Sequence, residues 1–252
     1  MMFFSGGKDS SVVLHFLQQA AQEFGFGFET HGALFPHHVY TPEDRGALDR
    51  YWNGRGVFIE WHAIPETDDR LAQAMAEGTS ACLVCNRAKK RVLMEKIGAR
   101  GIDLNSLVVV LSYSLWDLVS ACVEHIVGAV FADRQAAAAV HYKSVEERFH
   151  ETSQRFYPLL RMANGFTVFK PLIYYNDQEI LDVIAREKLP MLSTACNFKA
   201  IRPKRNFSQY YLRQGLRFDY QEVFTFARSV LKIPDADFFE RMDRGHYLRK
   251  VL

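Results

Sequence analysis

The sequence predicts an α/β protein in which a parallel sheet is flanked by helices and followed by a helical C-terminal extension. Short apolar runs alternate with stretches whose apolar residues recur at helical spacing, from the first residues to about residue 188. One run, residues 107–111, is continuously apolar and rich in valine, as a central parallel strand should be. After residue 196 no run has a strand pattern, so only helices are expected there.

The first strand is expected to end in a glycine turn that leads directly into a helix. Apolar residues 3–4 precede Ser-Gly-Gly-Lys-Asp-Ser-Ser at 5–11, and helical spacing then continues to about residue 24, before Gly25. Two adjacent glycines let the backbone approach a ligand, and the helix start adds unpaired N–H groups and the positive end of its dipole. This corner is therefore predicted to bind phosphate, although its spacing is neither Walker A nor Gly-x-Gly-x-x-Gly.

The later elements continue the same alternation. Strands are expected at residues 30–35, 57–64, 107–111 and 166–172. Helices are expected at about residues 41–52, 68–77, 87–100, 118–130 and 176–188, and in the tail at 207–216, 220–231 and 235–242. Residues 136–150 carry an alanine run and a charged segment with no chemistry that we can predict. Because ligands of open parallel sheets bind at the carboxyl ends of the strands, the glycine corner lies where a site is expected.

The composition is that of an ordinary globular protein. Apolar residues make up 48% of the 252 residues and charged residues 24%, which argues against a disordered or fibrous protein. A net charge of +2 restricts any nucleic-acid surface to a local patch. No apolar run could cross a bilayer and no signal pattern starts the chain, so we expect a cytoplasmic protein with no membrane partner. We predict an α/β domain at 1–195, which contains the glycine corner and the cysteine pair discussed below, and a helical extension at 196–252.

Four cysteines would be reduced thiols in that compartment, and two of them are spaced as Cys82-x-x-Cys85. This spacing permits a redox dithiol, a zinc site or an iron–sulfur cluster. Zinc would need a second pair, but Cys122 and Cys196 stand alone. Cys82, Cys85 and Cys196 would suit a [4Fe–4S] cluster with one open iron, whereas Cys122, in an apolar helix, is predicted to be a buried hydrophobic side chain.

These motifs in combination resemble a known superfamily. Ser-Gly-Gly-Lys-Asp-Ser at 5–10 resembles the PP-loop of the N-type ATP pyrophosphatases, whose sheet is Rossmann-like (adenine nucleotide alpha hydrolase-like). The Cys82-x-x-Cys85 helix with Lys89, the Phe-Lys-Pro-Leu-Ile-Tyr segment at 169–174 and Cys196 are similar to the TtcA/TtuA family of [4Fe–4S]-dependent tRNA 2-thiolation enzymes. The resemblance extends over about residues 3–200 in this order.

The resemblance implies an ATP-dependent sulfurtransferase. Such an enzyme adenylates a nucleobase carbonyl, here of a tRNA pyrimidine, and replaces the oxygen with sulfur while pyrophosphate and AMP are released. The implied cofactors are ATP, Mg²⁺ and a [4Fe–4S] cluster, and a sulfur donor is an implied partner. The implied catalytic residues are Lys89 and Asp117, and the implied cluster ligands are Cys82, Cys85 and Cys196. The implied nucleotide-binding residues are Ser5, Gly6, Gly7, Lys8, Asp9, Ser10, Ser11 and Phe35.

The chain departs from that family in the segment after the central strand, which would face the substrate that accepts sulfur. The family carries Gly-His-x-x-Asp-Asp after the central strand, where this chain has Ser-Tyr-Ser-Leu-Trp-Asp at 112–117, and Lys170 stands where arginine is usual. Alternatives are therefore the same chemistry on a small molecule or free nucleobase, an amide-forming ligase or a relative of sulfonucleotide reductases, and a non-enzymatic sensor. Residues 199–213 combine five cations with three aromatics, which suits RNA or an ordinary basic helix surface equally. A homodimer is also an open alternative.

Overall fold

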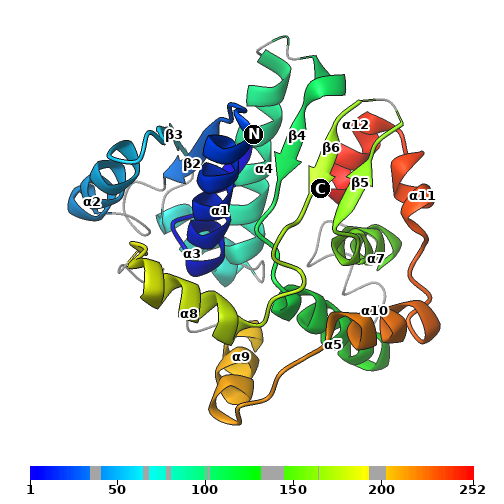
Figure 1. The fold of residues 1–252 in the computed structure, drawn as a ribbon. Coiled ribbons are helices and arrows are strands. Elements are labelled where there is room, and N and C mark those ends of the chain that lie inside the picture. The colour runs from blue at the N-terminus through cyan, green and yellow to red at the C-terminus, as the bar shows by residue number, and fades with distance from the viewer. Residues whose placement is uncertain are drawn as a thin grey trace. The chain divides into compact units, whose positions relative to one another are not determined.

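A computed structural model describes residues 1–34, 41–64, 68–77, 81–99, 101, 103–131, 145–163, 165–192 and 203–252 (Figure 1). Within these ranges one sheet has the strand order β3-β2-β1-β4-β6-β5. Its strands are β1 (Met2–Phe4), β2 (Thr30–Leu34), β3 (Ile59–Ala63), β4 (Val108–Val110), β5 (Leu159–Arg161) and β6 (Thr167–Phe169). β1 pairs in parallel with β2 and β4, β2 pairs in parallel with β3, and β5 and β6 are antiparallel. The predicted α/β class with a mostly parallel sheet is confirmed.

Helices alternate with these strands and then fill the C-terminal region. The first group is α1 (Lys8–Phe24), α2 (Pro42–Asn53), α3 (Asp68–Ala76), α4 (Ala81–Ala99), α5 (Leu115–Phe131), α7 (Val145–Ser153) and α8 (Asp177–Glu187). The tail holds α9 (Pro203–Arg213), α10 (Tyr220–Ser229), α11 (Ala236–Glu240), α12 (Arg244–His246) and the π-helical turn η4 (Tyr247–Val251). Short 3-10 turns are η1 (Leu104–Ser106) and η2 (Gln154–Phe156). Of the helices described, none has the length and apolar character needed to cross a membrane.

The chain divides into two compact units. Unit 1 comprises residues 1–100, 110–112 and 178–203, and unit 2 comprises residues 101–109, 113–177 and 204–252. These bounds differ from those of the predicted domains, whose boundary at residues 195–196 lies outside the described residues. The division into an ATP-binding domain and a helical extension stays a prediction.

In unit 1, the two faces of the strands β1, β2 and β3 are covered by different helices. On one face Trp61 lies over Gly32, where an added Cβ would be 2.3 Å from the indole, so only glycine fits. The Trp61 indole N–H donates to Asp49 of α2 at 2.7 Å, and Trp52 of α2 packs edge-on against Phe4. Helix α2 is therefore fixed over this face by its aromatic contacts.

Helix α4 covers the other face of these strands. Cys85, Ala88 and Val92 of α4 form a buried cluster with Ile64, which follows β3, and with Ala33 of β2. Farther along the helix, Lys96 reaches back to Glu60 near the start of β3, with Nζ 2.9 Å from Oε1. The helix therefore runs antiparallel to the strands, and its N-terminal turns lie at the carboxyl ends of β2 and β3.

Unit 2 contains a strand that sequence reasoning did not predict. β5 and β6 form an antiparallel hairpin in which Leu160 pairs with Val168. In β5 only Leu160 is buried, and both of its neighbours in the strand are exposed. Three residues with one buried side chain are too short to display a period, which is why β5 leaves no signal in the sequence.

Candidate functional site

The corner between β1 and α1 has the predicted strand, turn and helix, and its serines hold it in shape. Gly6 has a φ of +69°, a left-handed conformation that L side chains rarely adopt. The buried Ser10 hydroxyl donates to the Gly7 carbonyl at 3.0 Å and lies 3.0 Å from the Ser5 hydroxyl. Gly7 is the N-cap of α1 and offers no side-chain cap to the first N–H groups of the helix. Such N–H groups form an anion site.

A second segment of unit 1, residues 190–192, supports the corner from outside. The Ser11 hydroxyl donates to the Pro190 carbonyl at 3.2 Å, and the Leu192 N–H donates to the Gly6 carbonyl at 3.0 Å. The Leu192 side chain lies directly over Gly6, where an added Cβ would be 2.3 Å from its Cδ1. The backbone of the corner is thus held in place by residues that are far from it in the sequence.

Two charged side chains stand at the mouth of the corner. The Lys8 ammonium contacts the Asp9 carboxylate at 2.6 Å, and both side chains are partly exposed. An ammonium group beside helix N–H groups can contact phosphate oxygens, and a carboxylate can hold Mg²⁺. The corner therefore offers both charges that a magnesium-bound polyphosphate needs.

The Cys-x-x-Cys pair lies in the first turns of α4. Cys85 is a buried thiol packed against Ile64 and Ala33, at the carboxyl ends of β3 and β2. The corner starts at the carboxyl end of β1, the neighbour of β2 in the sheet, so Cys85 and the corner lie at the same edge of the sheet. The side chain of Cys82 lies outside the described residues, as do Phe35 and Cys196. Lys89, one turn after Cys85, is half-buried on the same helix.

Cys122 lies in unit 2, on α5, and is buried. Burial raises the pKa of the Cys122 thiol to about 11, so near neutral pH it is a thiol rather than the thiolate that binds metal. Its burial accords with the interpretation of this residue as a hydrophobic side chain.

Asp117 caps the N-terminus of helix α5. Its carboxylate accepts from the Ser114 backbone N–H at 2.9 Å and lies 3.3 Å from the Ser114 hydroxyl. Ser114 precedes the first helical residue, so the pair is a capping box with aspartate in the third position. The structure thus shows a structural role for Asp117 in unit 2, and a catalytic role stays a prediction.

We expect Asp117→Ala to lower the free energy of unfolding by about 1 kcal/mol, because one helix start loses its cap. Chemical denaturation measures this loss. Asp219→Ala is the matched control, since Asp219 caps α10 through the Glu222 N–H at 3.0 Å. Equal destabilisation with an additional loss of activity only in Asp117→Ala would assign Asp117 a role beyond capping, and unchanged stability in Asp117→Ala would contradict the capping role.

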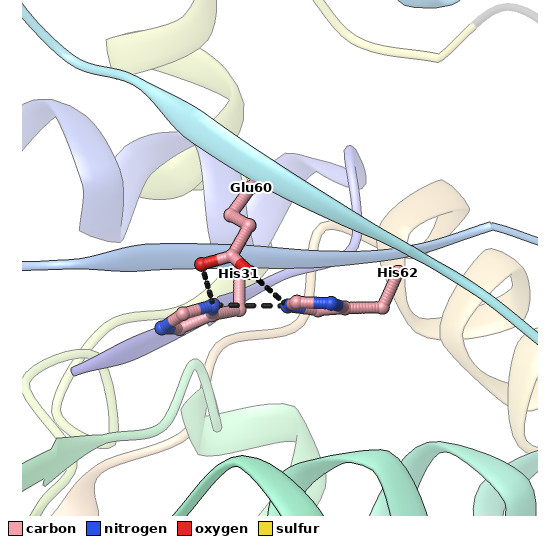
Figure 2. Close-up of side chains that lie close together, drawn as sticks. All are labelled: His31, Glu60 and His62. Carbon is pink, nitrogen blue, oxygen red and sulfur yellow. Dashed lines mark hydrogen bonds and ion pairs between the residues drawn. The ribbon is translucent and has the colours of Figure 1, made fainter. Parts of the chain in front are cut away.

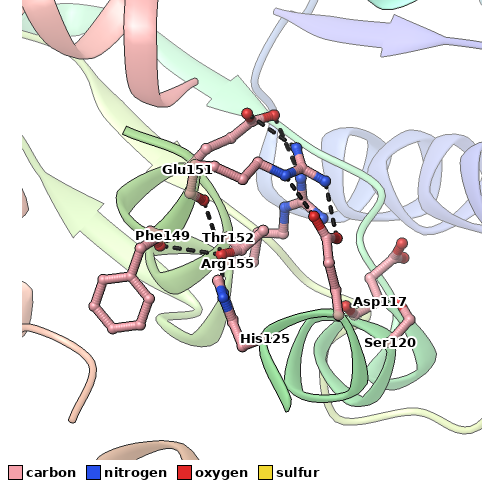
Figure 3. Close-up of polar contacts among 9 residues, drawn as sticks. Asp117, Ser120, His125, Phe149, Glu151, Thr152 and Arg155 are labelled. Atoms are coloured by element: carbon pink, nitrogen blue, oxygen red, sulfur yellow. Dashed lines mark hydrogen bonds and ion pairs between the residues drawn. The ribbon is translucent and has the colours of Figure 1, made fainter. Parts of the chain in front are cut away.

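A charged cluster of unit 2 joins helices α5 and α7, and Tyr113 lies next to it (Figure 3 shows the cluster). The Arg155 guanidinium lies 5.1 Å from the Tyr113 ring centroid, and burial raises the pKa of the Tyr113 phenol. Arg155 also pairs with Glu151 at 3.5 Å. Arg148 pairs with Glu151 at 3.0 Å and, through two hydrogen bonds, with Glu124 of α5. Sequence reasoning assigned no chemistry to residues 136–150, and in the structure Arg148 ties α7 to α5.

Lys170 is fully buried in unit 2, and its Nζ donates to the Tyr157 carbonyl at 2.7 Å. Burial, with the nearby Arg155 charge, lowers the pKa of Lys170 to about 7. The resemblance placed this residue where the family has arginine, but a side chain without exposed surface does not contact a phosphate in solution. We identify it as an interior group of unit 2.

Helix α9 presents part of the basic and aromatic segment predicted as an RNA surface. Phe207 and Tyr210 are about half exposed, whereas Tyr211 packs against Trp116 and Phe218 in unit 2. Residues 199–202 lie outside the described residues, and so do the side chains of the cations at 204 and 205. Of the predicted RNA surface, the structure therefore describes the exposed rings of Phe207 and Tyr210.

Comparisons with known proteins address the fold. No protein-family model matches the sequence, and no curated protein matches it. Among solved structures, the chain is similar to the U34-tRNA thiolase NcsA from Methanococcus maripaludis with its [4Fe–4S] cluster, with a TM-score of 0.61 and 13% identity over 93% of this chain and 72% of that chain. NMN synthetase from Francisella tularensis matches with a TM-score of 0.40 and 14% identity over 100% of this chain and 86% of that chain. The chain therefore shares its fold with the archaeal thiolase.

Proposed function

We propose that this chain binds ATP at the β1–α1 corner and uses it to adenylate a carbonyl oxygen, which sulfur then replaces. The observation that carries the proposal is the shared position of two groups in unit 1. The Ser5–Ser11 corner follows the carboxyl end of β1, and Cys85 packs at the carboxyl ends of β2 and β3. A phosphate site and a cysteine pair at one edge of a parallel sheet favour a reaction that needs both.

The corner would bind the triphosphate of ATP. Its helix N–H groups and the Lys8 ammonium would hold the phosphate oxygens, and Asp9 would hold Mg²⁺. Attack of the acceptor oxygen on the α-phosphorus forms one P–O bond and breaks the bond to pyrophosphate. Lys89 is proposed to stabilise the charge that develops at the α-phosphate.

The cysteines supply a donor set that fits an iron–sulfur cluster. Cys85 is a thiol in an apolar shell at the first turns of α4, and Cys82 precedes it by three residues on the same helix. Together with Cys82 and Cys196 it would hold three irons and leave the fourth to bind sulfide. The fold shared with a thiolase that carries a [4Fe–4S] cluster supports this proposal.

The proposed acceptor is a tRNA pyrimidine, and a second candidate is a small molecule or free nucleobase. The exposed rings of Phe207 and Tyr210 on α9 favour RNA, because aromatic side chains stack on unpaired bases. The capping role of Asp117 favours the second candidate, because this aspartate is the one residue retained from the family's acceptor motif. The sulfur donor is a further partner that the proposal requires.

Anaerobic purification and cluster reconstitution test the metal part of the proposal. We expect Cys82→Ala, Cys85→Ala and Cys196→Ala each to abolish cluster loading, measured by iron content and visible absorption. Cys122→Ala is the matched control and should load normally, because Cys122 lies in unit 2 and stays protonated. A colourless wild-type protein without iron, or bleaching by Cys122→Ala alone, would overturn the cluster assignment.

Pyrophosphate release from ATP tests the acceptor. With the cluster-loaded protein and bulk tRNA we expect stimulation of pyrophosphate release and sulfur incorporation into tRNA, detected by nucleoside mass spectrometry. Phe207→Ala with Tyr210→Ala should weaken this stimulation by roughly 10-fold or more, as lost base stacking predicts. Release without any response to tRNA would contradict the tRNA acceptor and favour the small-molecule one.

A further inference from the structure

Three side chains that can bind a metal ion converge on one face of the strands in unit 1 (Figure 2). His31 is on β2, and Glu60 and His62 are on β3. The register pairs His31 with Glu60 and Ala33 with His62. Because side chains alternate across a strand, all three point to the face that α4 covers, the face of Ala33 and Ile64. Two imidazoles and a carboxylate are a common ligand set for Zn²⁺.

The distances among the three groups match those of ligands around one ion. His31 Nδ1 lies 3.0 Å from His62 Nε2 and 3.5 Å from Glu60 Oε2, and His62 Nε2 lies 3.9 Å from Glu60 Oε1. Ligands about 2.0–2.1 Å from a tetrahedral Zn²⁺ are about 3.4 Å from one another. With one ligand atom from each residue, all three atoms lie within 4.8 Å of one another, so shifts on the order of 1 Å bring them around one ion.

A carboxylate behind His31 orients its ring for this role. His31 Nε2 lies 3.2 Å from Glu29 Oε2, a geometry in which the Nε2–H donates to the carboxylate. The neutral ring then carries its lone pair on Nδ1, the atom that faces His62 and Glu60. Metal-binding histidines are commonly held in this way by a carboxylate on the other ring nitrogen.

Burial and access also suit a bound ion. The His31 side chain is 1% exposed and that of His62 is 10% exposed, so the imidazoles are fixed by their surroundings, and Phe3 stacks on His31. Glu60 is 34% exposed. Glu60, Glu29 and His31 line a surface hollow of about 610 Å³ that also borders α1. Because Glu60 itself is partly exposed, an ion can reach the cluster from solvent, and a water molecule can complete its coordination.

We propose that His31, Glu60 and His62 form a binding site for a divalent transition-metal ion of the Zn²⁺ type. The site is separate from the cysteine pair, because Ala88 and Val92 of α4 lie between Cys85 and Lys96, which contacts Glu60. Binding would join β2 to β3 through the ion and stabilise unit 1. Lys96 competes with the ion for Glu60, since its ammonium lies 2.9 Å from Oε1.

Zinc binding is measured by equilibrium dialysis and metal analysis, in a chain in which Cys82, Cys85 and Cys196 are replaced by serine so that thiolates do not contribute. We expect one Zn²⁺ per chain. We expect a loss of at least about 100-fold in affinity in His62→Gln and Glu60→Gln and about 10- to 100-fold in Glu29→Gln, which only orients a ligand. His246→Gln, which replaces an exposed histidine in unit 2, is the matched control and should bind as the parent does.

The variant Lys96→Met tests whether His31, Glu60 and His62 bind a metal ion or form only a structural hydrogen-bonded cluster. Removing the competing ammonium should tighten Zn²⁺ binding by roughly 10-fold, because two like charges no longer share one carboxylate. In this triple-serine chain, Zn²⁺ should also raise the melting temperature, and Glu60→Gln, at a partly exposed position, should abolish that rise. Co²⁺ in the triple-serine chain, which keeps the buried Cys122, should give d–d absorption without thiolate charge transfer. No bound Zn²⁺ in the triple-serine chain, or equal binding in it and in its Glu60→Gln variant, would overturn the proposal.

Discussion

Gly6→Ala is expected to lower the affinity for ATP by roughly 100-fold, because the phosphate corner cannot keep its shape with a Cβ at this position. The residue has a φ of +69°, and the added atom would lie 2.3 Å from Leu192 Cδ1 and 2.5 Å from Cγ. Ordinary carbon contacts are about 3.5 Å, so one of the two segments must move by about 1 Å. The Leu192 side chain has to rotate away from Gly6, or its backbone N–H, now 3.0 Å from the Gly6 carbonyl oxygen, has to withdraw. Isothermal titration with a non-hydrolysable ATP analogue measures the affinity.

Gly25→Ala is the matched control for backbone strain. Gly25 also has a φ of +69°, ends α1, and has open space where a Cβ would be. Both variants should lose about 1–2 kcal/mol of stability from the left-handed backbone, but only Gly6→Ala should lose nucleotide. Equal ATP affinity in the two variants would show that the corner does not bind the nucleotide.

The stability of the wild type should rise with pH relative to that of Lys170→Met, by about 1.4 kcal/mol per pH unit between pH 8 and pH 10. In the folded protein burial lowers the pKa of Lys170 to about 7, whereas the unfolded chain keeps the ordinary value of 10.5. Between these values the unfolded chain holds one more proton than the folded chain. Raising the pH therefore removes a proton only from the unfolded state and favours folding.

Denaturation in urea over this pH range gives the measurement, as the difference between the two proteins. Lys250→Met is the control, because the Lys250 side chain is 41% exposed and pairs with Glu147 at the surface. Its stability should run parallel to that of the wild type at each pH. A constant difference between wild type and Lys170→Met across the range would contradict the lowered pKa.

The sequence predicts the corner and the α/β class because both depend on local features. Gly6 and Gly7 after an apolar run, followed by helical spacing, require a turn and a helix start within a few residues. The same reasoning identified Cys122 as a buried side chain, since its neighbours in the predicted helix are apolar. Phe35 and Cys196 lie outside the described residues and stay predictions.

Other features of the candidate sites depend on contacts that no local pattern contains. The resemblance implies a catalytic role for Asp117, which stays a prediction, and the structure adds the contact of its carboxylate with the Ser114 N–H. His31 and His62 carried only a weak signal, the alternation of polar residues within two apolar strands.

The sequence by itself determined the alternation of strands and helices and the strand, turn and helix start around Ser5–Ser11, but it placed the start of the cysteine helix at residue 87, whereas α4 begins at Ala81. Periodicity and glycine act over a few residues, so they can be read without knowing what packs against them. Only the tertiary structure decided that His31 meets Glu60 and His62, that Lys170 is buried and that Leu192 closes over Gly6. These contacts depend on strand pairing and register, where a shift of one residue would turn every side chain to the opposite face.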